Sequence, residues 1–136
     1  MPELGGSAAS RRNVWHSGWA FHNQGLWDEA ARRYRDSLEL AAEVGDRFLT
    51  AGVVMSVAGL HASQGEFQRG LSLAAAAGAA LAASGVPVPP VYQALFDRWL
   101  EPAVRAAGSE VADRLWQAGH TMSLTKAVAA ALADSQ

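Results

Sequence analysis

The chain has 136 residues, of which 50% are hydrophobic and 18% charged, with a net charge of -2 and no cysteine. This length and composition predict one globular domain and exclude an intrinsically disordered chain, disulfide bonds and thiolate chemistry. The slightly negative charge also argues against a domain that coats nucleic acid.

Residues 1–12 are rich in glycine, serine and alanine and lack the apolar stretch of a secretory signal, so we expect a flexible tail there. The longest bland run, Leu71 to Ala83, is shorter than the roughly 20 residues that cross a bilayer. We therefore expect a cytoplasmic protein that does not contact a membrane.

The first two helices are expected at about 13–23, with Asn13 as the cap, and at about 27–44. Carboxylates in the first turn of the second helix suit the positive end of the helix dipole. Gly45 follows as a residue that can end a helix in the left-handed conformation. The spacing predicts a first helical hairpin.

A second pair of helices is expected at about 46–63 and 66–84. The first of these is apolar around most of its circumference, which indicates a helix packed between neighbours. Gly85 ends the second helix, and the proline-rich segment 86–90 forms a stiff linker.

Three more helices are expected after the linker, at about 91–107, 110–118 and 124–134. Pro102 should kink or split the first of them. Ser109 and Ser123 are expected to cap the other two, and Gly119 to end the second. No segment alternates with the period of two that strands require.

One element of the sequence occurs twice. Gln24-Gly25-Leu26-Trp27 recurs 40 residues later as Gln64-Gly65-Glu66-Phe67, and Gly45 recurs as Gly85. An internal repeat of this length is typical of stacked helical hairpins. We predict an all-α fold with one domain at 13–136. It consists of the repeats 13–45 and 46–85 and of the capping helices in 90–136.

The repeat positions resemble a tetratricopeptide repeat. The residues that carry the resemblance are Gly18, Phe21, Gly25, Ala30 and Tyr34. Ser37 stands where alanine is usual, and in the second repeat His61 and Ala74 replace bulky residues. The resemblance implies a superhelix of antiparallel helix pairs, although the period exceeds the 34 residues usual in this family.

A wider resemblance extends over about 39–132. The segments that carry it are 40–46, 58–60, 64–66, the Pro89-Pro90 linker and 119–128. Together they look like the C-terminal repeat segment of bacterial multidomain ATPase regulators of the LuxR, AfsR and MalT-like type. The resemblance implies an upstream ATPase module and a segment that senses inducers or partners. The chain itself contains no recognisable ATPase or helix-turn-helix sequence.

Trp15 and Trp19 lie one helical turn apart, on the side that faces the concave groove in a tetratricopeptide hairpin. The candidate contact set is Arg12, Trp15, Trp19, His22, Asn23 and Met55. Opposite the aromatic wall, the second repeat supplies small residues, so the groove could hold an extended peptide, an apolar ligand or a helix. In the alternative that we favour, the C-terminal helices or an upstream repeat cover these tryptophans.

No catalytic motif is present. The chain lacks the phosphate-binding pattern G-x-x-x-x-G-K-[ST], and residues 61–65 miss the G-x-S-x-G pattern. The four histidines have no zinc-type spacing, and His61 fits a core or rim position better than a ligand position. We therefore expect no catalytic residue, no metal and no cofactor.

These observations predict a non-catalytic module for protein interaction or sensing. The wider resemblance implies that the module belongs to a larger bacterial transcriptional regulator with an ATPase module. Its partners would be a protein or other modules of the same regulator, and it would not contact nucleic acid directly. The alternative is a stand-alone helical adaptor that associates with itself, because a short helical array exposes an uncapped apolar end. On this ground we expect a homodimer or a higher oligomer.

Overall fold

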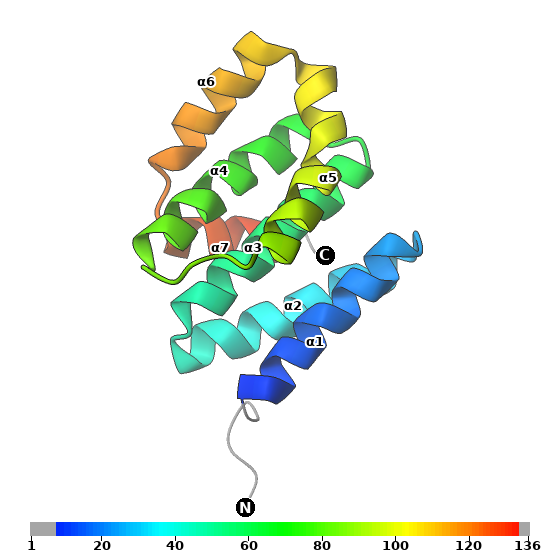
Figure 1. Ribbon diagram of the computed structural model, residues 1–136, viewed down its shortest axis with the longest axis vertical. Coiled ribbons are helices and arrows are strands. Elements are labelled where there is room, and N and C mark those ends of the chain that lie inside the picture. The colour runs from blue at the N-terminus through cyan, green and yellow to red at the C-terminus, as the bar shows by residue number, and fades with distance from the viewer. Residues whose placement is uncertain (1–7, 134–136) are drawn as a thin grey trace, which may run out of the picture.

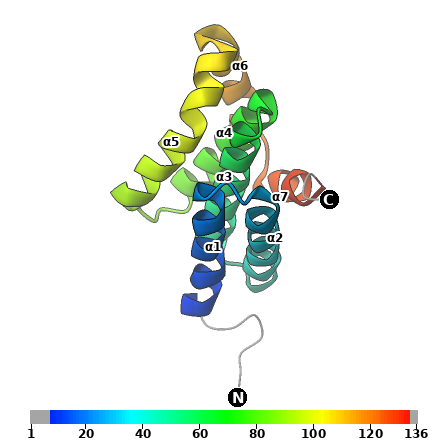
Figure 2. The same ribbon diagram turned by 90° about the vertical axis from the view of Figure 1, so that its right-hand side faces the viewer.

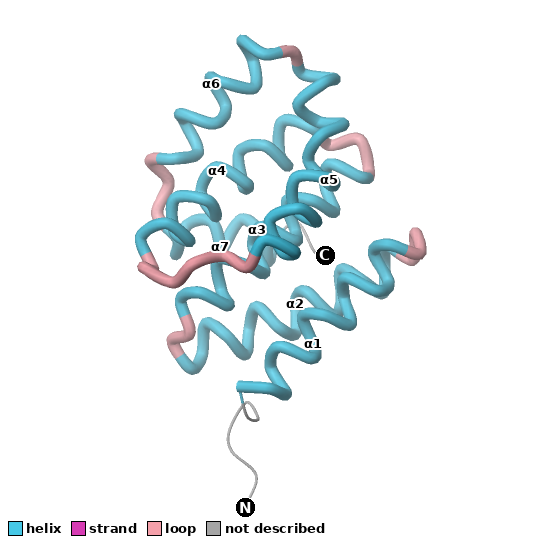
Figure 3. Tube along the Cα trace, viewed as in Figure 1, coloured by secondary structure: helices cyan, strands magenta, loops and turns pink. Residues whose placement is uncertain are grey.

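The computed structural model describes residues 8–133, and within this range it contains seven helices and no strand (Figure 1). The helices are α1 (Ala8–Asn23), α2 (Trp27–Val44), α3 (Arg47–Ser63), α4 (Phe67–Ala83), α5 (Pro90–Ala107), α6 (Ser109–His120) and α7 (Leu124–Ala133). The predicted all-α fold is confirmed. Figure 3 shows short connections throughout, except for the longer linker between α4 and α5.

The first four helices form two hairpins, α1 with α2 and α3 with α4, which meet through contacts of α3 with both α1 and α2. The two hairpin turns have the same backbone conformation and the same hydrogen bond. Gly25 and Gly65 have φ values of 78° and 83°, and the Leu26 and Glu66 amides donate to the Phe21 and His61 carbonyls, both at 2.9 Å. A positive φ favours glycine, so the repeated glycines in the sequence correspond to a repeated turn.

Helix α3 lies at the centre of the molecule. Every residue from Leu49 to Ala62 is buried, because α1, α2, α4, α5 and α7 all contact this helix. Figure 2 shows α1 and α5 on one side of α3, and α2 and α7 on the other. The prediction of an apolar helix between neighbours is confirmed. Helix α6 packs mainly on α4, so the three C-terminal helices do not simply continue the stack.

The start of the first helix was predicted wrongly. Helix α1 begins at Ala8, so residues 8–12 of the expected tail are helical. Asn13 consequently lies inside the helix and does not cap it. Residues 1–7 of the expected tail lie outside the described residues. Because Arg12 and Trp15 share one helix, they are held by the same rigid element.

Three expectations for the C-terminal helices also need correction. Pro102 does not split α5, which is continuous; the carbonyl that Pro102 leaves unpaired belongs to exposed Arg98, where water can bind it. Gly108, not Ser109, precedes α6, and Gly119 lies within that helix. The predicted cap of α7 is confirmed, since Ser123 Oγ accepts from the Lys126 amide at 3.1 Å.

Gly119 is needed where α6 crosses α4. A Cβ at this position would collide with the carbonyl oxygen of Ser72 and lie 2.7 Å from the Cβ of Ala75. At Gly78, which lies on α4, a Cβ would meet Trp116 at 3.4 Å and Met55 at 3.9 Å, both ordinary contact distances. Two glycines near one interface therefore differ in what they tolerate.

We expect Gly119→Ala to lower the free energy of unfolding by about 1–3 kcal/mol, because backbone atoms of α4 cannot move aside easily. Gly78→Ala is the matched control and should leave stability unchanged or raise it by up to about 1 kcal/mol through helix propensity. Urea denaturation measures both. Equal stabilities of the two variants would show that α6 does not approach α4 as described.

Candidate functional site

The predicted contact residues Trp15 and Trp19 converge on one hydroxyl of α3. The Trp15 and Trp19 indole nitrogens donate to Ser56 Oγ at 2.8 and 3.0 Å, and this hydroxyl donates to the Gly52 carbonyl at 3.0 Å. One donor and two acceptors are all that a serine hydroxyl offers, so Ser56 is fully satisfied. Gly52 is required there, since a Cβ would lie 2.6 Å from the Trp15 ring.

Helix α5 covers these tryptophans. Tyr92, Phe96 and Trp99 meet Trp19 edge-on, with ring centroids 4.9, 6.1 and 6.2 Å from its own. Trp15 is only 1% exposed. The groove expected between the first helices of the two repeats is therefore filled by the chain itself. This arrangement is the alternative in which C-terminal helices cover the tryptophans.

His22 joins four helices at the far end of this aromatic cluster. Its Nδ1 lies 3.0 Å from the Tyr34 hydroxyl and its Nε2 lies 2.8 Å from Ser63 Oγ. Ser63 Oγ donates its hydrogen to the Gly59 carbonyl, so Nε2 must donate and Nδ1 must accept from Tyr34. The imidazole stacks on Trp99, with the ring centroids 4.1 Å apart.

This environment keeps His22 neutral. Burial, with a smaller contribution from the Arg98 charge, lowers the pKa of His22 to about 4. Burial also raises the pKa of the Tyr34 hydroxyl. Both groups are thus uncharged hydrogen-bond partners near pH 7. His22 therefore has a structural role, since it connects α1 to α2, α3 and α5.

The remaining predicted residues lie apart from one another. Asn23 Oδ1 accepts from Trp99 Nε1 at 3.1 Å and from Arg98 at 3.4 Å, so it binds α5. Arg12 is exposed and lines a small cavity of about 180 Å³ with Trp15 and Asp46. The structure therefore brings Trp15, Trp19 and His22 together and places Arg12 and Asn23 at the two ends of the cluster.

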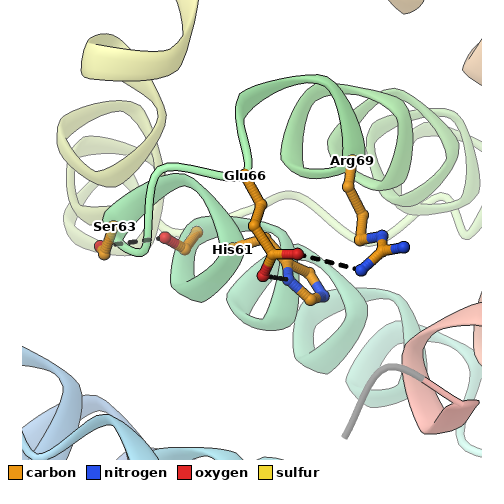
Figure 4. A network of polar contacts seen from close by, with 5 residues as sticks. His61, Ser63, Glu66 and Arg69 are labelled. Carbon is orange, nitrogen blue, oxygen red and sulfur yellow. Dashed lines mark hydrogen bonds and ion pairs between the residues drawn. The ribbon is translucent and has the colours of Figure 1, made fainter.

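A second polar network fastens the turn between α3 and α4 (Figure 4). His61 Nδ1 and Arg69 Nη1 each lie 3.0 Å from an oxygen of Glu66, and the hydrogen bond with His61 is the main cause that lowers the pKa of Glu66. Figure 4 shows Ser63 pointing away from His61. His61 is buried at the edge of the core, as expected for a core or rim histidine.

Met55, the last predicted residue, faces a different region. Two cavities of about 570 and 380 Å³ adjoin each other and share Met55, Gln93 and Trp116 in their walls. We call them together the α4–α6 groove. It runs between α4, the linker, α5 and α6, and its apolar walls include Leu71, Leu81, Val86, Val88, Leu100 and Val104.

The groove carries both exposed apolar surface and charge. Val86, Val104 and Trp116 are 48%, 44% and 42% exposed. The smaller cavity is also lined by three carboxylates, of Asp97, Glu101 and Asp113, and by no lysine or arginine of residues 8–133. An apolar concavity with a few polar groups at its rim is the usual form of a ligand site.

The sequence analysis missed Trp116 and Gln93. Trp116 had only a weak signal: adjacent residues of a helix lie about 100° apart, and the apolar face of a surface helix is not much wider than that. Leu115 packs against the core and Trp116 is exposed. Gln93 had no comparable signal, since its place depends on how the linker directs α5.

Comparison with known proteins gives no relative for this chain: no family model matches it, and neither curated proteins nor solved structures show significant similarity. Within residues 8–133, no three histidine, aspartate or glutamate side chains are grouped so that they could hold a metal ion. No helix in that range has the length and apolar character of a membrane span. The site is therefore interpreted from its own geometry.

The His22 environment predicts how stability depends on pH. In the unfolded chain this histidine has its ordinary pKa of 6.5, whereas in the folded protein it resists protonation until about pH 4. Its contribution to stability is complete above pH 6.5 and is lost as the pH falls toward 4. Between pH 7 and 5 the loss is about 2 kcal/mol.

His22→Gln removes this titration, so its stability should fall less between pH 7 and 5 than that of the wild type. Urea denaturation at both pH values measures the difference. His120→Gln, at an exposed histidine, is the control and should keep the wild-type dependence. An unchanged pH dependence in His22→Gln would contradict the described environment.

Proposed function

We propose that the chain is a non-catalytic binding module whose contact surface is the α4–α6 groove. One observation carries this proposal: three exposed large apolar side chains, Val86, Val104 and Trp116, line the same groove above the buried floor residue Met55. Isolated exposed apolar residues are ordinary, but a group of them in one concavity marks a site of interaction.

This proposal retains the expected class of function and moves its location. Four of the predicted contact residues form hydrogen bonds to other helices of the chain and so hold the helices together: Trp15, Trp19, His22 and Asn23. Of the predicted contact set, Met55 lines the groove. The binding surface is thus made largely by the linker and the helices that follow the repeats.

A finer proposal places this module in a larger bacterial transcriptional regulator with an ATPase module, in the cytoplasm. The resemblance of residues 39–132 to the repeat segment of such regulators supports it. The DNA sequence upstream of the codon for Met1 tests it. An ATPase module encoded in the same reading frame is expected, and an unrelated neighbouring gene would contradict it.

Self-association is the second candidate. Val91 on α5 is 71% exposed, the most exposed of the large apolar side chains described. A homodimer that covers α5 would bury it. Sedimentation analysis at high protein concentration should then show a dimer, and a strict monomer would reject this candidate.

The binding proposal predicts that a neutral apolar dye such as Nile red enters the groove. Trp116→Ala should weaken dye binding about fivefold, which corresponds to the roughly 1 kcal/mol that an aromatic contact contributes. Trp27→Ala is the matched control, because Trp27 is similarly exposed (37%) but lies at the start of α2. Fluorescence titration measures both. Absence of dye binding, or equal loss in the two variants, would contradict the proposal.

A further inference from the structure

The two halves of the α4–α6 groove differ in charge. The larger cavity has one titratable lining residue, His120, and is otherwise lined by apolar side chains, glycines and Gln93. The smaller cavity has three carboxylates, from Asp97 and Glu101 on α5 and Asp113 on α6. Trp116 belongs to the walls of both cavities. A ligand that spans the groove would therefore meet an apolar end, an indole ring and an acidic end.

The acidic residues are only partly compensated. Asp97 accepts a hydrogen bond from Gln93 at 2.8 Å, which fixes its carboxylate without neutralising it. Glu101 pairs with Arg105 at 3.5 Å, but both side chains of this pair are largely exposed, so water screens the interaction. Asp113 has no described ion pair. The smaller half of the groove thus places three carboxylates beside apolar lining residues that include Leu71 and Leu100.

Resting on the proposed function, we propose that the α4–α6 groove binds a small organic cation with an apolar body, its charge beside Asp97, Asp113 and Trp116. The cavities of about 570 and 380 Å³ fall in the range of small-molecule sites. Tryptophan is the best aromatic partner for a cation, because its ring face is electron-rich. Carboxylates at one end give the site its preference for positive charge.

A second copy of the chain fits this groove poorly. Two copies that meet groove to groove would bring the same three carboxylates of each copy together. The exposed Trp27 of another copy is followed by Asp28 and Glu29, which the acidic half would repel. Charge complementarity therefore favours a cationic occupant over this chain itself.

Tetraphenylphosphonium and tetraphenylborate test the charge preference directly, because these ions have nearly the same shape and opposite charge. We expect isothermal titration calorimetry on the full chain to show at least about tenfold tighter binding of the cation. Asp97→Asn combined with Asp113→Asn should weaken cation binding about tenfold and should not weaken binding of the anion.

The control pair Asp28→Asn with Asp36→Asn changes the net charge equally, at exposed residues of α2. Its affinity for the cation should stay within about twofold of the wild type. Equal binding of the two ions, or an equal loss in both pairs of variants, would overturn the inference. Nile red binding in the same variants verifies that the groove is intact.

The outcomes also separate this inference from the proposed function. Dye binding that depends on Trp116, without preference for the cation, overturns the inference and leaves the binding proposal in place. Absence of binding for the dye and for both ions overturns both. A dimer that Trp116→Ala dissociates would identify the groove as a self-interface and would overturn the inference.

Discussion

The arrangement of the helices depends on one buried hydroxyl, Ser56 Oγ. It accepts both indole N–H groups of α1 and donates to the carbonyl of Gly52, so three polar groups are satisfied at one point. A buried donor without a partner costs about 1–3 kcal/mol, and loss of this hydroxyl would remove the acceptor of the buried Trp15 indole and of the part-buried Trp19 indole. The small residues Gly52 and Gly59 let the Trp15 and Trp99 rings lie directly on α3. Ser56 therefore sets the position of α1 against α3.

This contact also decides where the chain can bind a partner. Once Trp15 and Trp19 lie on α3, they form an aromatic surface that Tyr92, Phe96 and Trp99 of α5 cover. The concave side of the two hairpins is then closed. Helix α5 diverges from α4 beyond this cluster, and α6 returns along α4, which leaves the α4–α6 groove between them. The fold thus covers the concave side of the hairpins and leaves the α4–α6 groove as the candidate binding surface.

The sequence predicted the features that local chemistry controls. The repeated turns were predictable because Gly25 and Gly65 need a positive φ, and the central place of α3 was predictable because its apolar residues cover its circumference. The start of α1 was missed because alanine and serine at 8–10 suit a helix as well as a tail. The groove was missed because it depends on the path of α5 after the linker, and no local pattern around Gln93 or Trp116 encodes that path.

Hydrogen exchange of the tryptophan indole N–H groups tests the central contact most directly. Nuclear magnetic resonance resolves these signals, and Trp→Phe substitutions assign them. The account predicts strong protection of the Trp15 indole, which is 1% exposed and bonded to Ser56, and fast exchange at Trp116, which is 42% exposed. Exchange of Trp15 as fast as that of Trp116 would show that α1 is not fastened to α3, and would contradict the account.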